Sequence, residues 1–460
     1  MSDPVTNVRA VSAPGGFAPG HLGGLTAQVP PEVVDAVLAE TGRVEQRARL
    51  LPARVVVYLL LAGALFEDVG WRQVWARLVR AVPGRVVAPS SPAISQALRR
   101  VGVAPLAALF DLLRGPAATT ANVSWRGLLV CAIDGTQILV PAGAANETVF
   151  SRHPTILGGG SGYPAVRIVA LVACGTRSLI DALFGPTTTG EVAMAPGLAR
   201  SLRPGMLVLG DRNFCARNVV AALATTGAQL LFRFKTASTA ARLQRVLDYA
   251  DGSWLAWHGP TLVRVIDASI TVTLPDGTTR AESYRLITTL LDPDQAPAAV
   301  LVRLYHQRWQ IETAYCELKS TLLRGRVLRA RTRTVSPRRS IYALLTCYQI
   351  LRTAMTDATN TNPDMAPDRA SFTIALLAAR DQIVTAHRAL DETATDLIGL
   401  IGAAVLADLL PAPRHRTRQR IRKRAISKYN AKGPAIDHHT YPIRVTITIE
   451  RETLTPASTP

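Results

Sequence analysis

Three carboxylates in this sequence have positions that suit metal-dependent chemistry. Asp134 closes the apolar run LLVCAID and Asp211 closes MLVLGD, so both are expected at strand ends, where α/β sheets place functional groups. Glu312 lies on a helix predicted over residues 296–324. A lone aspartate after a strand often only caps a turn, but two of them with a glutamate can form an oxygen-ligand cage for hard divalent ions. Two such ions side by side can activate an attacking oxygen and stabilise the leaving oxygen of a phosphodiester.

The helix predicted around Glu312 carries a narrow polar stripe. At about 100° per residue, one face holds Tyr305, Arg308, Glu312 and Lys319, with an apolar stripe beside it. The other acid of this segment, Glu317, points elsewhere. Arg308 and Lys319 could neutralise phosphates next to bound metal ions, and Tyr305 could add a hydroxyl. An ordinary amphipathic helix would also carry polar residues at these spacings, so the stripe gains its meaning from the two aspartates.

The charge of the chain indicates a polyanionic partner. A formal net charge of +19 and a pI near 10.5 favour binding to nucleic acid. Between Arg414 and Lys432 the chain is densely basic and contains no acid. Such a run can be a solvated tail, but at this density contact with phosphates is the favoured interpretation.

Composition excludes several other classes of protein. The longest apolar stretch, Val55–Phe66, is too short to span a bilayer, so we expect no membrane association. The five cysteines have neither CxxC nor Cys/His spacing, which argues against a structural zinc site and predicts buried thiols in a reducing compartment. The N-terminus lacks an apolar signal core. A cytoplasmic protein of bacterial type fits these features.

We predict four segments along the chain, and the fold class is α/β. They are a disordered arm over 1–28, an N-terminal helical domain over 29–118, an α/β domain over 119–357 and a helical region with a basic tail over 358–460. The N-terminal helices could contact DNA or be purely structural. Runs that are apolar on both alternations predict a mixed sheet flanked by helices in the α/β domain. A mostly β insertion is expected at about 236–292, where Pro-Asp-Gly signals a hairpin.

The sequence resembles a known family. The spacing of Tyr305, Arg308, Glu312 and Lys319 matches the Y-x2-R-x3-E-x6-K signature of the IS4-type DDE transposases without departure. The surroundings of the two aspartates, IDGT at 133–136 and GDRNF at 210–214, are also similar to that family. So are the flanking segments LRARTRTVSPRR and KRAISKYNAK. The resemblance covers most of the chain from about residue 30.

This resemblance implies a fold and a site. The α/β domain would be an RNase H-like catalytic core, a mixed sheet flanked by helices and interrupted by the β insertion. Asp134, Asp211 and Glu312 would be the catalytic and metal-binding triad for two Mg²⁺ ions, with Mn²⁺ as a substitute. DNA contacts are expected from the basic and signature residues Tyr305, Arg308, Lys319, Arg331, Arg422, Lys423, Arg424 and Lys428.

The resemblance also implies an activity on double-stranded DNA. Family members bind terminal inverted repeats, bring two ends together through self-association, expected here as a dimer, and nick the DNA. The freed 3′-hydroxyl then joins target DNA, through a hairpin intermediate in some relatives. An insertion-domain aromatic holds an extruded base in such relatives, and Trp254 and Trp257 are the candidates here, with packing inside the insertion as the alternative.

Two alternatives stay open at this stage. Asp181, in SLIDALFG, is a competing strand carboxylate that would replace Asp134 or Asp211 if either assignment failed. The rival function is a catalytically silent, domesticated descendant that binds repeat ends or acts as a repressor without cutting. A nuclease of RNase H type without strand transfer is disfavoured by the insertion and the basic run.

Overall fold

The computed structural model describes most of the chain. The described ranges are 21–47, 49–80, 86–119, 123–154, 160–235, 243–329, 337–362, 364–385, 397–411, 416–417 and 441–450. The chain divides into two compact units, unit one (Met1–Ser201 with Trp309–Leu410) and unit two (Leu202–Arg308 with Pro411–Pro460). The protein is mixed α/β with an N-terminal helical region and helices after residue 337, which confirms the predicted fold class.

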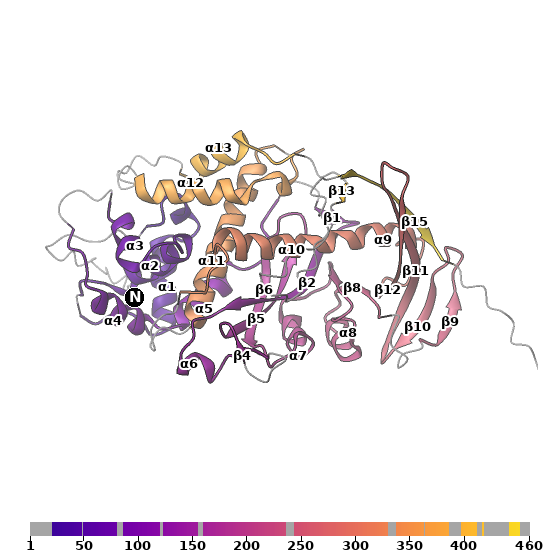
Figure 1. The fold of residues 1–460 in the computed structure, drawn as a ribbon, viewed down its shortest axis with the longest axis horizontal. Coiled ribbons are helices and arrows are strands. Elements are labelled where there is room, and N and C mark those ends of the chain that lie inside the picture. The colour runs from indigo at the N-terminus through magenta and orange to yellow at the C-terminus, as the bar shows by residue number, and fades with distance from the viewer. Residues whose placement is uncertain are drawn as a thin grey trace, which may run out of the picture. The chain divides into compact units, whose positions relative to one another are not determined.

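Unit one begins with a group of N-terminal helices. Its N-terminal elements are η1 (Leu25–Ala27), α1 (Pro31–Glu40), α2 (Ala53–Leu65), α3 (Trp71–Leu78), α4 (Ser91–Val101) and α5 (Ala104–Leu113). Nearly every side chain of α2 is buried, as expected for a helix that is apolar all round. Helix α4 begins where the Ser90 hydroxyl accepts the amide of Ala93. The long helix α11 (Pro337–Thr359) packs against α2 and α5 (Figure 1).

The predicted disordered arm is too long. Leu22 and Leu25 are fully buried, so the packed structure already includes the last residues of the predicted arm. The reason is a long-range contact, because the Gly24 amide donates to the side chain of Gln382 in α12 (Phe372–Thr385) at 3.0 Å. Residues 1–20 lie outside the described ranges.

The strands of unit one form an antiparallel sheet. Its order is β6 (Leu179–Pro186), β5 (Ala165–Ala173) and β2 (Leu128–Leu139), with the short β1 (Ser124–Trp125) also paired to β2. The expectation that Asp134 ends a strand is wrong. Strand β2 continues through it to Leu139 because Asp134 pairs with Ala170 and the ladder runs on to the pair Leu139–Ala165. The flanking elements are α6 (Ala144–Glu147), β3 (His153–Pro154), β4 (Gly160–Ser161), α7 (Glu191–Met194) and η2 (Ala195–Ser201).

The segment predicted as one uniform α-helix changes its winding three times. In chain order it consists of α9 (Ala298–Tyr305), a 3-10 turn η3 (His306–Arg308), α10 (Trp309–Cys316) and a six-residue π-helix η4 (Glu317–Leu322). The first two elements belong to unit two and the last two to unit one. A stripe drawn at a constant 100° per residue therefore does not describe this segment. Helices α12 and α13 (Leu397–Ala407) complete the described part of unit one.

Unit two joins a parallel strand pair to an antiparallel sheet. Strand β7 (Met206–Gly210) runs parallel to β8 (Gln229–Arg233), and α8 (Arg217–Ala224) follows β7 in the chain. The sheet continues from β8 through β12 (Thr279–Thr288), β11 (Thr261–Thr273) and β10 (Trp254–His258) to β9 (Arg245–Asp248). The antiparallel trio of unit one and the parallel pair of unit two are the strand directions expected of an RNase H-like core.

The prediction of a helical C-terminal region with a basic tail is wrong at its end. Residues Arg444–Ile449 form β15, which pairs antiparallel with β11 from Thr273–Arg444 to Ala268–Ile449. After its arginine, the segment RVTITI consists of β-branched residues, which favour strands. Every second side chain is exposed, so the segment suits the edge of a sheet. The remaining short strands are β13 (Arg416–Thr417) and β14 (Tyr441–Pro442), which pair with each other.

None of the helices in the described ranges is long and apolar enough to cross a membrane.

Candidate functional site

In unit one, the helix that carries Glu312 is hydrogen-bonded to the strand residue Asp134. The buried hydroxyl of Tyr315, three residues after Glu312, donates to the Asp134 carbonyl oxygen at 2.6 Å and accepts the Ala170 amide at 3.2 Å. Since Asp134 and Ala170 face each other across the ladder, the hydroxyl bridges the two strands at the aspartate itself. Burial raises the pKa of Tyr315 well above its ordinary value, so the hydroxyl keeps its proton. The half-buried side chains of Asp134 and Glu312 thus belong to two elements that one buried contact holds together.

Lys319 lies beside the same strand. Its ammonium group donates to the Thr136 hydroxyl at 3.2 Å. Thr136 is two residues after Asp134, so the two side chains project from the same face of β2. A compact cation therefore stands next to the strand position of the first aspartate, as a phosphate-neutralising role requires.

A contact that the sequence did not reveal lies next to Asp134. A Cβ atom on Gly135 would stand 2.3 Å from the Glu191 carboxyl group, so any larger residue at this position would displace the end of that side chain. Glu191 also faces Arg167 across 3.8 Å. The motif IDGT gave the glycine, but nothing local identified the acid that fills the space above it.

In unit two, the loop that carries Asp211 is fixed from two sides. The Asp211 carboxylate accepts the Asn213 amide at 2.8 Å, which turns the chain directly after β7. The buried hydroxyl of Tyr305 donates to the carbonyl of Gly210 at 3.2 Å, and the ring of His258 lies 3.0 Å from the Cys215 carbonyl. Asp211 thus follows a strand end, as predicted, and is itself half-buried.

The Tyr305 hydroxyl was expected to contact a phosphate. In this structure it is hydrogen-bonded to the backbone next to Asp211, and burial raises its pKa. Burial also raises the pKa of Tyr284, and at both hydroxyls the positive charges of Arg308 and Arg233 oppose this rise without cancelling it. The Arg233 guanidinium stacks 3.9 Å from the centre of the Tyr284 ring. Sequence reasoning missed Arg233 and Tyr284, since both come from strands distant in the chain.

The two tryptophans of the insertion have different surroundings. Trp254 is buried, its indole donates to Asp267 at 3.1 Å, and Arg245 and Arg285 lie over its ring. Its packing inside the insertion excludes it as a surface for an extruded base. Trp257 is 54% exposed on β10, so the base-stacking hypothesis rests on this residue alone.

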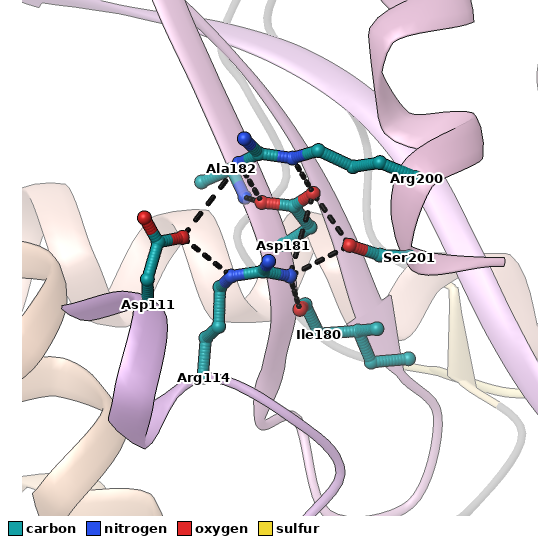
Figure 2. A network of polar contacts seen from close by, with 7 residues as sticks. All are labelled: Asp111, Arg114, Ile180, Asp181, Ala182, Arg200 and Ser201. Atoms are coloured by element: carbon teal, nitrogen blue, oxygen red, sulfur yellow. Dashed lines mark hydrogen bonds and ion pairs between the residues drawn. The ribbon is translucent and has the colours of Figure 1, made fainter. Parts of the chain in front are cut away.

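Asp181 is a structural carboxylate. Its side chain is fully buried. Figure 2 shows it between the guanidinium groups of Arg200 and Arg114 and the Ser201 hydroxyl. Burial raises its pKa, but the hydrogen bonds from Arg200 and Ser201 and the charge of Arg114 outweigh this effect and bring the pKa below the ordinary value. All its oxygen atoms are engaged by the protein, so it does not replace Asp134 or Asp211.

Metal binding by the three carboxylates stays a prediction. Within the described ranges, no group of three His, Cys, Asp or Glu side chains is arranged to hold a metal ion. Asp134 and Glu312 belong to unit one and Asp211 to unit two. The donor set nevertheless suits a hard divalent ion, since it consists of half-buried carboxylates. The predicted DNA contacts Arg331, Arg422, Lys423, Arg424 and Lys428 lie outside the described residues.

Two family profiles match the chain. Residues 19–111 match "Insertion element 4 transposase N-terminal", and residues 125–349 match "Transposase DDE domain". The chain is similar to "Transposase InsG for insertion sequence element IS4" of Escherichia coli (strain K12), with 24% identity over 416 residues that cover 87% of this chain and 91% of that protein. "Putative transposase InsZ" of the same strain is 27% identical over 206 residues, 43% of this chain and 66% of that protein.

A solved structure is similar as well. It is the "Cryo-EM structure of piggyBac transposase synaptic complex with hairpin DNA (SNHP)", with 11% identity, a TM-score of 0.41 and coverage of 86% of each chain. This likeness is too weak to bear on the function.

Proposed function

The chain belongs to the IS4 family of DDE transposases, and we propose that it binds the terminal inverted repeats of an insertion sequence, cleaves the DNA ends and joins them to target DNA. The DDE domain makes it an enzyme of DNA cleavage and strand transfer, in a family that depends on divalent metal ions. We further propose that it works on double-stranded DNA in the bacterial cytoplasm and dimerises when it pairs two ends.

The Tyr315 bridge carries the assignment of the site. A buried hydroxyl that contacts both strands at one residue pair has a geometric task, because it fixes α10 to the ladder at that pair. Here the contact holds the strand that carries Asp134 and the helix that carries Glu312 at a fixed distance from each other. Two residues that act together in catalysis need such a fixed distance. With Asp211, these residues are our proposed triad.

Two Mg²⁺ ions held by the triad, or Mn²⁺ in their place, would supply activation of the attacking oxygen and stabilisation of the leaving oxygen. The protein's own contribution is to orient the DNA backbone. Lys319, held at Thr136, offers a point charge to a phosphate next to Asp134, and Arg308 offers a planar, bidentate donor next to Tyr305. We propose that these two cations act in the steps after the first nick.

We propose that cleavage proceeds through a hairpin in which the freed 3′-hydroxyl attacks the opposite strand. The exposed indole of Trp257 would stack on the base that the tight turn of the hairpin expels from the helix. The chain's net charge of +19 would supply the salt-dependent part of DNA binding.

The test uses the purified protein and a DNA fragment that contains one end of the element. Asp134→Ala, Asp211→Ala and Glu312→Ala are each expected to abolish the Mg²⁺-dependent 3′-hydroxyl nick and to leave binding of the end largely intact. The exposed acid Asp248 provides a control, since Asp248→Ala should cut normally. Cleavage by any of the three variants would remove that residue from the triad. A wild-type protein that binds the end but cuts with neither Mg²⁺ nor Mn²⁺ would support the silent descendant instead.

A further inference from the structure

We propose that Glu317 is a positioning residue of the strand-transfer site, whose buried carboxylate fixes the π-helix η4 and thereby holds the Lys319 ammonium against strand β2. This inference rests on the proposed function of Lys319. It assigns a task to the acid that the polar stripe of the sequence left out.

The carboxylate of Glu317 is almost completely enclosed by donors. Arg177 donates to Oε1 at 3.0 Å, the Tyr348 hydroxyl lies 3.1 Å from Oε2, and Arg352 also donates to Oε2. Arg352 and Tyr348 are each 1% exposed, and Glu317 is 8% exposed. A buried network in which every oxygen has a partner is rigid, because any rotation of the carboxylate would leave a desolvated charge unpaired.

The donors come from two elements that are far from Glu317 in the chain. Arg177 lies in the turn between β5 and β6, where its φ of 56° is uncommon for a residue other than glycine. Tyr348 and Arg352 lie one turn apart on α11. The network therefore fixes η4 against both a strand turn and the long helix α11.

The π-helix begins at Glu317 and ends three residues after Lys319. Its widened winding is seen in the backbone bond from the Leu323 amide to the Leu318 carbonyl, which spans five residues at 3.0 Å. A π-helical turn is rare in proteins overall. Where one occurs, it often lies at a functional site. Residues two apart on a helix point to roughly opposite sides, so fixing Glu317 in the core directs Lys319 outward, toward Thr136 on β2.

Stability alone does not explain this arrangement. Replacing a buried ion pair by apolar residues of similar volume is often neutral or stabilising. A network of charges at this place therefore indicates that side chains must be held in one orientation. In this segment the side chains that need a fixed direction are Glu312 and Lys319, and the π-helix begins between them, at Glu317.

The first test measures the position of Lys319 without any DNA cleavage. Acetylation of Lys319 by an N-hydroxysuccinimide ester is followed by mass spectrometry in the whole protein. Glu317→Gln, and the smaller change Tyr348→Phe, are expected to raise the acetylation rate of Lys319 several-fold relative to that of the other lysines. Asp181→Asn, which disturbs another buried, arginine-held carboxylate away from η4, serves as the matched control and should leave the rate unchanged (Figure 2). An unchanged rate in both test variants would overturn the proposal.

The second test separates positioning from folding. Glu317→Gln and Lys319→Ala should each slow joining about tenfold relative to the first nick, and the double variant should be no slower than Lys319→Ala alone. Multiplied losses in the double variant, or the same selective loss in Asp181→Asn, would show that Glu317 has only a structural role. Failure of the wild type to cut would count against the proposed function, while the acetylation result would still decide the role of Glu317.

Discussion

Removing the Tyr315 hydroxyl tests whether the Glu312 helix is positioned by Asp134. In Tyr315→Phe, the Asp134 carbonyl loses a donor at 2.6 Å and the Ala170 amide loses an acceptor at 3.2 Å. Both groups are part of a buried ladder, and no water replaces the hydroxyl if the ring stays in place. The two backbone groups could pair directly only if the ring withdrew, and this would move α10 away from β2.

The magnitude follows from the number of groups left unpaired. One unsatisfied buried group costs about 1–3 kcal/mol, so we expect a loss in the free energy of unfolding of about 2 kcal/mol if the two groups partly re-pair. A displaced Glu312 should also slow the nick. If about 1.4 kcal/mol of positioning is lost in the transition state, the rate falls about tenfold.

The assay compares Tyr315→Phe with a matched variant of the N-terminal helices. Tyr58 is a fully buried tyrosine whose hydroxyl donates to the Val29 carbonyl, also at 2.6 Å. Tyr58→Phe should therefore lower stability by a comparable amount and leave the nicking rate unchanged. Rates are measured on an end-containing DNA at saturating Mg²⁺, at a temperature where urea titrations show that both variants are folded. Equal rates for the two variants would refute the positioning role of Tyr315.

Three further predictions concern a base, a strand contact and pH. Trp257→Ala should reduce hairpin formation on end DNA several-fold with a normal first nick, whereas Trp254→Ala should lower thermal stability; an unchanged hairpin yield in Trp257→Ala would end the stacking hypothesis. Thr136→Val removes the hydrogen-bond acceptor of Lys319. It should reduce the rate of joining by a larger factor than the affinity for DNA, as joining assays and gel shifts on one preparation would show. Burial raises the pKa of Glu67 from 4.5 to about 7, so the folded state holds an extra proton between these values, and stability should fall by up to about 3 kcal/mol as pH rises from 4.5 to 7. Urea titrations of Glu67→Gln should lack this slope, and a slope equal to that of the wild type would contradict the assignment.

The sequence was informative wherever the chemistry depends on local spacing. The signature from Tyr305 to Lys319 lies within fifteen residues, and the apolar runs before Asp134 and Asp211 are strands, so these positions could be read from the chain. The basic charge depends only on composition, and the absence of long apolar stretches depends only on the local order of residues. The family followed from these local features, and two profiles and a relative matched over 87% of the chain confirm it.

The errors arose where distant residues decide the local structure. Strand β2 runs through Asp134 because β5 offers it a partner, and β15 forms because β11 has an open edge. The helix after Arg308 widens into a π-helix at Glu317, where a buried network holds it, although its sequence fits a regular α-helix.

The sequence by itself determined which residues could do chemistry, since their types and spacing are local properties of the chain. Only the tertiary structure decided what holds them. The bond from Tyr315 to Asp134 joins residues 181 positions apart, and that from Arg177 to Glu317 joins residues 140 apart. Contacts at such separations leave no trace in periodicity, because they depend on which elements pack together and not on how each element is formed.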